Sequence, residues 1–229
     1  MTQAQGNFLG TGEGEAGEPR TTQERVYTEL RNAILRGRFL PGNQVTIRGL
    51  AEQLDCSPMP VREALRRLIS EQALALGDTR RVTVPSMTQE KLAEICDARV
   101  ALECQAAAMA LPNLGAGELQ TLRELDDRVT RALDEGDTEA YVTSNLEFHF
   151  YLYQQGRPQV VLALIESLWL QTAPLQHLVF NRFGVERMPD RHQDLLEAIV
   201  DRDEIAVRRA IEQDIREGLG SLSLEELSG

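Results

Sequence analysis

The stretch SPMPVREALRRL, residues 57–68, decides the fold of the first third of this chain. Ser57 is predicted to cap a helix, and Pro58 then stands at the first helical position, where its missing N–H costs nothing. A helix that starts with small or polar residues and carries arginines behind them suits the major groove of DNA. Its buried stripe is expected at Val61, Ala64, Leu65, Leu68 and Ile69, because these apolar residues recur at helical spacing.

Two further helices are predicted before this one. Thr21 and Glu24 form a capping-box pattern ahead of an amphipathic helix that ends near Gly37. Thr46 can cap a short helix over about residues 47–54, and a two-residue break separates it from the helix after Ser57. Two short helices joined by a tight break are the helix-turn-helix arrangement.

Two short β-like runs, residues 73–76 and 82–85, follow the three helices and flank the segment 77–81. This spacing predicts a two-stranded wing. We therefore expect residues 21–86 to form a winged helix-turn-helix domain.

The polar and basic residues of this segment are the candidate contacts to double-stranded DNA. Early positions of the reading helix face base edges, and arginines on the neighbouring helix and in the wing can reach phosphates. The alternative is an ordinary three-helix domain with solvated arginines, but the spacing, the caps and the charge agree on DNA. The candidate contacts are Arg48, Ser57, Pro58, Met59, Pro60, Arg62, Arg66, Arg80 and Arg81.

The net charge of −12 does not by itself exclude a nucleic-acid partner, because the charge is unevenly distributed along the chain. Residues 20–86 hold 11 arginines and 7 acidic residues, a net charge of +4, whereas residues 87–229 hold 13 basic and 26 acidic residues, a net charge of −13. A local basic surface can dock on phosphates even when the field of the whole chain opposes it. The asymmetry also places a domain boundary near residue 86.

From residue 87 to residue 229 the pattern is helical throughout. Short loops between successive helices predict an all-α antiparallel bundle, so the whole chain is expected to be mainly α. The predicted helices cover about residues 88–111, 116–135, 138–155, 158–181 with a kink near Pro174, 188–200 and 203–219. On the second of these helices Leu119, Leu122, Leu125, Val129 and Leu133 are expected to face inward.

Residues 1–20 are rich in glycine and glutamate and are predicted to be a disordered tail. They lack the apolar and basic regions of a secretory signal, and no run of the chain approaches the 18 apolar residues of a membrane span. Cys56, Cys96 and Cys104 fit no metal or disulfide spacing, which favours buried thiols in a reducing compartment. We expect a cytoplasmic protein without a membrane partner.

Four segments resemble a known family. ERVYTELRNAILRGRFLPG (24–42) and LAEQLDCSPMPVREALRRLISEQAL (50–74) closely resemble the DNA-binding domain of GntR-superfamily transcription regulators. RVALECQAAAMA (99–110) and NLEFHFYLY (145–153) resemble the FCD-type effector domain of the FadR branch. The resemblance covers about residues 21–218. It implies that Arg48, Ser57, Pro58, Met59, Pro60 and Arg62 contact operator DNA.

The chain departs from this family at the reading head. Pro58 and Met59 stand where many relatives have an arginine and a threonine, so we expect a different base preference. Arg81 stands where the wing usually has a glycine, so we also expect a different geometry at the tip.

Asn145 and His149 lie four residues apart on one predicted helix, so both side chains emerge on one face. A histidine among aromatic residues is, by itself, more often a hydrogen-bonded core residue. The resemblance implies a metal site, because many FCD domains bind a divalent ion through an aspartate and three histidines. Asn145 matches the aspartate, His149 and His192 match two histidines, and Asp214 matches the third. This set can hold zinc, nickel or manganese; the alternative is a polar pocket filled by water or by a direct ligand contact.

Arg99 and Glu103 also lie four residues apart. The simplest interpretation is an ion pair within one helix, which contributes a few tenths of a kcal/mol. The resemblance favours a second interpretation, because small carboxylates bind near the metal in related regulators, and Arg99 can then clamp a carboxylate effector. Tyr141, Trp169 and His177 can line the same cavity or pack in the core, and we expect the core for Trp169.

The leading hypothesis is therefore a transcription regulator, expected to be a repressor, that is gated by a small carboxylate and acts as a homodimer on a pseudo-palindromic operator. A second hypothesis is a DNA-binding dimer whose bundle senses nothing. A third is a metal-dependent enzyme, in which His149, His192 and Asp214 activate water. No general base with a recognisable motif and no glycine-rich phosphate loop supports the third, so we do not expect an enzyme.

Overall fold

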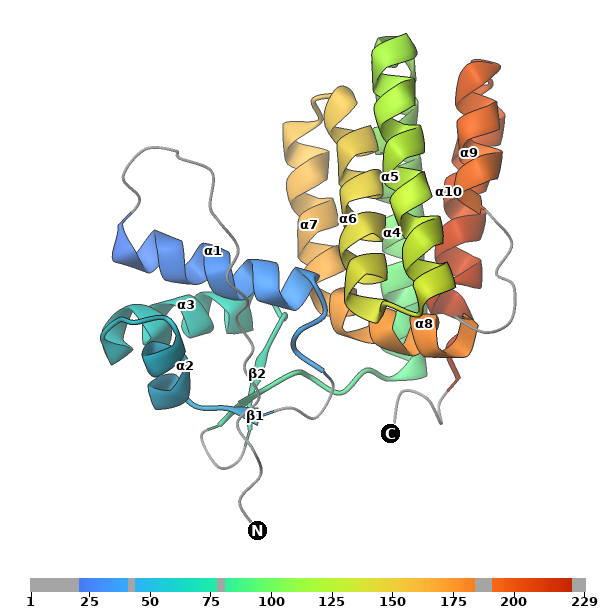
Figure 1. The fold of residues 1–229 in the computed structure, drawn as a ribbon. Helices are drawn as coiled ribbons and strands as arrows, with labels where there is room; N and C mark the ends of the chain where they lie inside the picture. Colours follow the sequence, from blue (N-terminus) through green and yellow to red (C-terminus); the bar gives the residue numbers. More distant parts are fainter. Residues whose placement is uncertain (1–20, 41–43, 78–80, 184–190, 224–229) are drawn as a thin grey trace.

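The computed structural model describes residues 21–40, 44–77, 81–183 and 191–223. Three sequence predictions lie wholly or partly outside these residues, namely the disordered tail over 1–20, the DNA contact at Arg80 and the start of the predicted helix at 188–190. The described chain forms a small N-terminal unit beside a tall helical bundle (Figure 1).

The N-terminal unit contains the three predicted helices, α1 (Thr22–Leu35), α2 (Ile47–Gln53) and α3 (Pro58–Ser70). Thr21 accepts a hydrogen bond from the Glu24 N–H and the Glu24 carboxylate accepts one from the Thr21 N–H, so the capping box is confirmed. The backbone amide of Gly49 donates to the Thr46 hydroxyl, as expected for a cap of α2.

The wing has three strands, not the two that the sequence predicts. β1 (Gln44–Val45) precedes α2 and pairs antiparallel with β3 (Val82–Thr83), which pairs on its other side with β2 (Ala75–Leu76). Val45 lies opposite Val82 and both are buried, which ties the wing to the chain ahead of the reading helices. A strand of only two residues is too short to show a period in the sequence.

The bundle matches the predicted helices with one division. Pro174 falls in a short 3-10 segment, which separates two helices where a single kinked helix was predicted. Because proline lacks the N–H that continues the helical ladder, the chain turns there, and α8 runs across one end of the bundle (Figure 1). The elements are α4 (Gln89–Ala110), η1 (Leu111–Asn113), α5 (Ala116–Glu135), α6 (Thr138–Gln155), α7 (Gln159–Thr172), η2 (Ala173–Leu175), α8 (Gln176–Phe183), α9 (Arg191–Val200), α10 (Glu204–Glu217) and η3 (Leu219–Ser221).

The inward face of α5 is mixed in character. Leu122 and Val129 are buried as predicted, whereas Leu119, Leu125 and Leu133 are only partly buried. Asp126 lies in the same stripe and is 9 % exposed. A buried carboxylate requires hydrogen-bonding partners, so this position marks a site inside the bundle.

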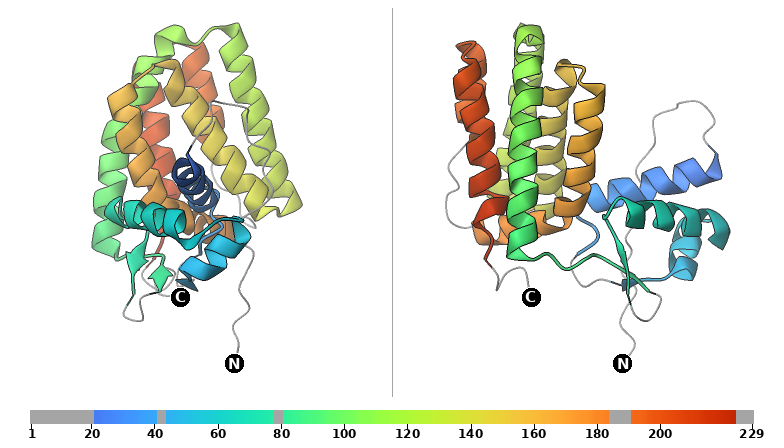
Figure 2. Two further views of the ribbon diagram at one scale, coloured as in Figure 1. Left: turned by 90° about the vertical axis from the view of Figure 1, so that its left-hand side faces the viewer. Right: turned by 180° about the vertical axis from the view of Figure 1, so that it is seen from behind.

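The two units meet where α1 ends. Arg31 of α1 forms an ion pair with Glu166 of α7 at 2.7 Å, and the Nε atom of Arg38 donates to Glu139 of α6 at 3.1 Å. Gly37 has a φ of +68°, and a Cβ there would lie 2.5 Å from the His177 ring. The views of Figure 2 show α1 running up to the side of the bundle at this seam.

Within the described ranges, no helix combines the length and the apolar character that a membrane span requires.

Candidate functional site

The N-terminal turn of α3, which is the candidate reading head, is exposed. Ser57, Pro58 and Met59 are exposed, and Met59 keeps 64 % of its surface in contact with solvent. The other face of α3 is buried, with Val61 fully enclosed against the rest of the small domain. The helix is therefore held by its apolar stripe while its first turn is presented outward.

Ser57 occupies the cap position, but its hydroxyl makes no capping hydrogen bond, contrary to the prediction. Pro60 accounts for part of this. A cap hydroxyl accepts from the second or third helical N–H, and Pro60 at the third position has none, so the Met59 N–H is the one remaining donor. Ser57 itself is exposed.

The candidate arginines differ in how they are held. Arg48 and Arg62 are exposed, and neither forms an ion pair within the described part of the chain. Arg66 is paired with Glu63 at 2.8 Å, which reduces the positive charge that it offers. Arg81 donates from Nη1 to the Gln44 side chain at 3.0 Å, which anchors the wing to β1.

Inside the bundle, three ligand-type side chains converge from three helices. His149 of α6, His192 of α9 and Asp214 of α10 place one donor atom each within 4.8 Å of the others. The Nε2 atoms of the two histidines are 3.3 Å apart, and His149 Nε2 lies 3.3 Å from Asp214 Oδ2. A tetrahedral ion bound at about 2.0–2.1 Å has ligand atoms about 3.3–3.4 Å apart, so these separations fit zinc-like coordination.

The remaining ring nitrogens are fixed by partners outside this cluster. Tyr153 donates its hydroxyl to Glu103 at 2.7 Å, so its oxygen is left to accept from His149 Nδ1 at 3.2 Å. Asp126 lies 2.9 Å from His192 Nδ1 and can only accept. If both rings carry their proton on Nδ1, the two Nε2 lone pairs face each other and the Asp214 carboxylate, an arrangement that is favourable only with a cation or an added proton among these three atoms. A proton on His149 Nε2 makes the hydrogen bond to Asp214 Oδ2.

Asp214 adds negative charge at this point. Burial raises the pKa of its carboxyl, but the hydrogen bond with His149 and the charges of His149, His192 and Arg99 outweigh that effect and lower the pKa to about 2. The carboxylate is therefore ionised at neutral pH, as a metal ligand must be.

Asn145 is 8 % exposed and lies one turn before His149 on α6. It shares a small void of about 20 Å³ with Arg99 and Asp214. Its assignment as a fourth ligand stays a prediction.

Arg99 forms the predicted ion pair with Glu103, but the pair is buried. Arg99 is 2 % and Glu103 0 % exposed, and Arg99 Nε lies 2.6 Å from Glu103 Oε1. The same carboxylate also accepts from Trp169 Nε1 at 3.1 Å and from the Tyr153 hydroxyl. The estimate of a few tenths of a kcal/mol applies to exposed pairs and is wrong here, because burial makes each unpaired charge costly.

The guanidinium of Arg99 is oriented toward the void. Its carbon lies 4.3 Å from the centre of the Trp169 ring, and Nη1 lies 3.4 Å from the Thr172 hydroxyl. Glu103 accepts from Nε and Nη2 and Thr172 accepts from Nη1, so a ligand in the void would share or replace the long Nη1 contact.

The three further cavity candidates separate into two places. Tyr141 and Trp169 line the void beside Arg99, and Trp169 is also core, with 1 % exposure, as expected. His177 instead packs on Gly37 at the seam between the units, so its position points to domain packing.

The sequence missed Asp126 and Tyr153 as parts of this site, and it named Glu103 only as the ion-pair partner of Arg99. Asp126 left one signal, because it is an acid inside the apolar stripe of α5, three and four residues from buried neighbours. Tyr153 gave none that separates it from ordinary helix residues, since the carboxylate to which it donates comes from another helix.

Comparison with known proteins places both units in families. Residues 22–84 match the family described as bacterial regulatory proteins, gntR family, and residues 94–217 match the FCD domain. The HTH-type transcriptional regulator McbR of Escherichia coli (strain K12) is 29 % identical over 201 residues, which cover 86 % of this chain and 91 % of the relative. The HTH-type transcriptional repressor GlaR of the same strain is 26 % identical over 191 residues, 77 % of this chain and 84 % of the relative.

Solved structures show the same architecture. E. coli McbR/YncC has a TM-score of 0.80 at 28 % identity, covering 88 % of this chain and 97 % of the other. A putative GntR regulator from Rhodococcus sp. RHA1 has a TM-score of 0.72 at 24 % identity, covering 88 % and 99 %. With both domains matched in sequence and in fold, the chain belongs to the GntR family of transcriptional regulators and joins its helix-turn-helix to an FCD domain.

Proposed function

We propose that this regulator is a homodimeric repressor of a pseudo-palindromic operator. Its affinity for the operator changes when a small carboxylate binds in its bundle. The observation that carries the proposal is the pairing of an exposed reading head on α3 with a buried site that holds ligand-type donors and an arginine. The void beside Arg99 has a volume of about 20 Å³, roughly the room of one water, so binding of a carboxylate requires the surrounding side chains to move apart.

We assign Arg62 as the central contact to DNA. It is exposed on α3, one turn behind Met59, and it has no partner in the described chain that would compete with DNA. Arg48 of α2 is equally free and is proposed to hold a phosphate. Arg66 and Arg81 already have partners within the chain, Glu63 and Gln44, and would have to release them to bind DNA. They are proposed as supporting contacts.

Replacing Arg62 with alanine is expected to weaken operator binding by about 5- to 150-fold, because a base or phosphate contact of an arginine contributes about 1–3 kcal/mol. Fluorescence anisotropy on the operator at several salt concentrations measures the change. The matched control is Arg209→Ala, which removes the same charge from an exposed position on α10. Equal affinities of the two variants would contradict the assignment of α3 as the reading helix.

A second copy of the chain is proposed to cover α7. Val160 and Leu164 are 76 % and 50 % exposed and lie four residues apart, so they form one apolar stripe. Met109 of the neighbouring α4 is 38 % exposed. A dimer through this face buries the stripe twice, once on each copy, as an interface with two-fold symmetry requires.

Leu164→Ala is expected to raise the dimer dissociation constant about 30-fold. Half of the side chain is available for burial, about 1 kcal/mol, and each of the two copies loses it. Sedimentation equilibrium measures the constant. Ile205→Ala is the control, because Ile205 is 81 % exposed on another helix and its loss should change nothing. If both variants dimerise like the wild type, α7 is not the interface.

The metal is proposed to sit among His149, His192 and Asp214, with Asn145 as the fourth ligand. Zinc, nickel and manganese all accept this donor set. A bound ion supplies a positive charge that attracts a carboxylate, while Arg99 orients that carboxylate through its Nη1 edge. The effector can shift DNA binding only by the difference between its affinities for the two states of the dimer.

A further inference from the structure

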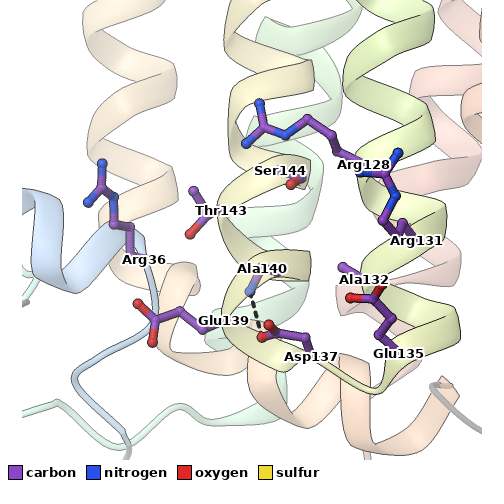
Figure 3. Close-up of a pocket in the computed structure, with 10 residues that line it drawn as sticks. All are labelled: Arg36, Arg128, Arg131, Ala132, Glu135, Asp137, Glu139, Ala140, Thr143 and Ser144. Atoms are coloured by element: carbon purple, nitrogen blue, oxygen red, sulfur yellow. Dashed lines mark hydrogen bonds between the residues drawn. The ribbon is translucent and has the colours of Figure 1, made fainter.

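A second pocket lies at the seam between the DNA-binding unit and the bundle. It has a volume of about 510 Å³ and shares no lining residue with the void beside Arg99. Its walls come from the end of α1 and from the corner where α5 passes into α6 (Figure 3). The lining residues are Arg36, Arg128, Arg131, Ala132, Glu135, Asp137, Glu139, Ala140, Thr143 and Ser144.

Arginines stand on opposite walls of this pocket. Arg36 projects from α1 on one side, and Arg128 and Arg131 project from α5 on the other (Figure 3). Arg128 is paired with Glu147 at 2.7 Å. Among the interactions of the described residues, Arg36 and Arg131 form no ion pair, so both charges are available to a ligand.

The acidic lining residues are largely occupied. Asp137 caps α6 and accepts from the Ala140 N–H at 3.0 Å, the contact drawn in Figure 3. Glu139 is held by Arg38. Glu135 and Asp137 have no ion-pair partner in the described chain, so two acids stand against the two unpaired arginines.

A hydroxyl completes the polar lining. Ser144 is only 3 % exposed and yet lines the pocket, so the little surface it retains faces this space. Thr143 lines the pocket beside it. A volume of this size falls in the range of small-molecule sites, which combine a few convergent polar groups with a concave wall.

We propose that this pocket binds a small organic anion with two separated anionic groups, one held by Arg36 and the other by Arg131. The opposite positions of the two arginines call for a ligand that spans the pocket, such as a sugar bisphosphate or an extended dicarboxylate. Because Arg36 belongs to the DNA-binding unit and Arg131 to the bundle, such a ligand ties the two units together. It would act on operator binding separately from the carboxylate in the bundle.

Isothermal titration of the full-length protein with fructose 1,6-bisphosphate and, in a separate arm, with adipate tests the proposal. At least one of the two probes is expected to bind the wild type. The variants R36Q and R131Q should each weaken that binding about tenfold, the usual effect of losing one charge-assisted hydrogen bond. The control R123Q removes an exposed arginine of α5 that does not line the pocket, and it should leave the affinity unchanged.

The variant H192A separates this pocket from the bundle site. Binding that survives H192A and falls in the double variant R36Q/R131Q supports the proposal. The proposal is overturned if neither probe binds at millimolar concentration, if the double variant binds like R123Q, or if binding is lost in H192A alone. The last outcome would assign the probe to the bundle site and would leave the carboxylate proposal standing.

Discussion

Replacing Glu103 with alanine is expected to lower the free energy of unfolding by about 3–5 kcal/mol, the usual cost of leaving one partner of a buried ion pair uncompensated. Three donors lose their acceptor at once, namely the Arg99 guanidinium, the Trp169 indole N–H and the Tyr153 hydroxyl. Urea denaturation at a single protein concentration measures the loss, since the concentration also sets the fraction of dimer.

The chain provides a matched control for Glu103. Glu204 and Arg208 form an ion pair at 2.9 Å with the same four-residue separation, but their side chains are 56 % and 37 % exposed. Glu204→Ala should therefore cost no more than about 0.5 kcal/mol. If Glu103→Ala cost as little as Glu204→Ala, the buried network would not stabilise the bundle and Arg99 would not depend on it.

The conservative variant Glu103→Gln separates charge from shape. Glutamine can still accept from the Trp169 indole and from Arg99, so the bundle should keep more of its stability than in the alanine variant. We expect an intermediate loss for this variant. A loss as large as that of alanine would mean that the negative charge, and not the hydrogen bonds, holds Arg99.

Replacing His192 with alanine is expected to weaken divalent metal binding more than about 100-fold, because loss of an outer partner alone costs about 10- to 100-fold. Asp126→Asn removes such an outer partner and should fall within that range. Competition of Zn²⁺, Ni²⁺ and Mn²⁺ against a chromophoric chelator gives the affinities. Asp134→Asn, an exposed acid on the same helix, is the control and should bind like the wild type.

This graded series also separates a metal from a shared proton. If a proton joins the two facing Nε2 atoms, the wild type binds no stoichiometric metal after dialysis and the series is flat. If the ion is bound elsewhere, His192→Ala and the wild type have equal affinities. Either result would remove the metal from the bundle site.

The carboxylate is tested with the same proteins by thermal shift, with and without chelator. A ligand present at 1,000 times its dissociation constant stabilises the folded state by about 4 kcal/mol. We expect stabilisation of the wild type by at least one small carboxylic acid and none in His192→Ala. A screen without any shift would leave a DNA-binding dimer whose bundle only dimerises.

The helix boundaries could be predicted from the sequence because capping residues close to each helix end set them. The predicted spans 116–135 and 138–155 coincide with α5 and α6, since Gly136 adopts a left-handed φ of +69° at the end of α5 and Asp137 caps α6. Local signals were weaker at β1. This strand forms only by pairing with β3, whose residues lie 37 or more positions farther along the chain.

The ligand-type residues of the bundle could be named from the sequence only with the help of the family resemblance. His149 and Asn145 share a helix face by spacing, but His192 and Asp214 belong to other helices, and no period in the sequence relates them. The resemblance supplied that relation. Asp126, which orients His192, was missed because the family pattern names ligands and not the groups behind them.

The sequence by itself thus determined the elements of this protein, because capping residues, prolines and apolar periods act over a few neighbouring positions. The exposed SPMP turn at 57–60 was also predicted from local residues, apart from the Ser57 capping bond, which does not form. Tertiary structure alone decided which charges are buried. The Arg99–Glu103 spacing is the same as that of exposed pairs, and only the packing of α4 against α6 and α7 turns it into a buried network. Burial depends on which other helices pack against a residue, and the local sequence pattern does not contain that information.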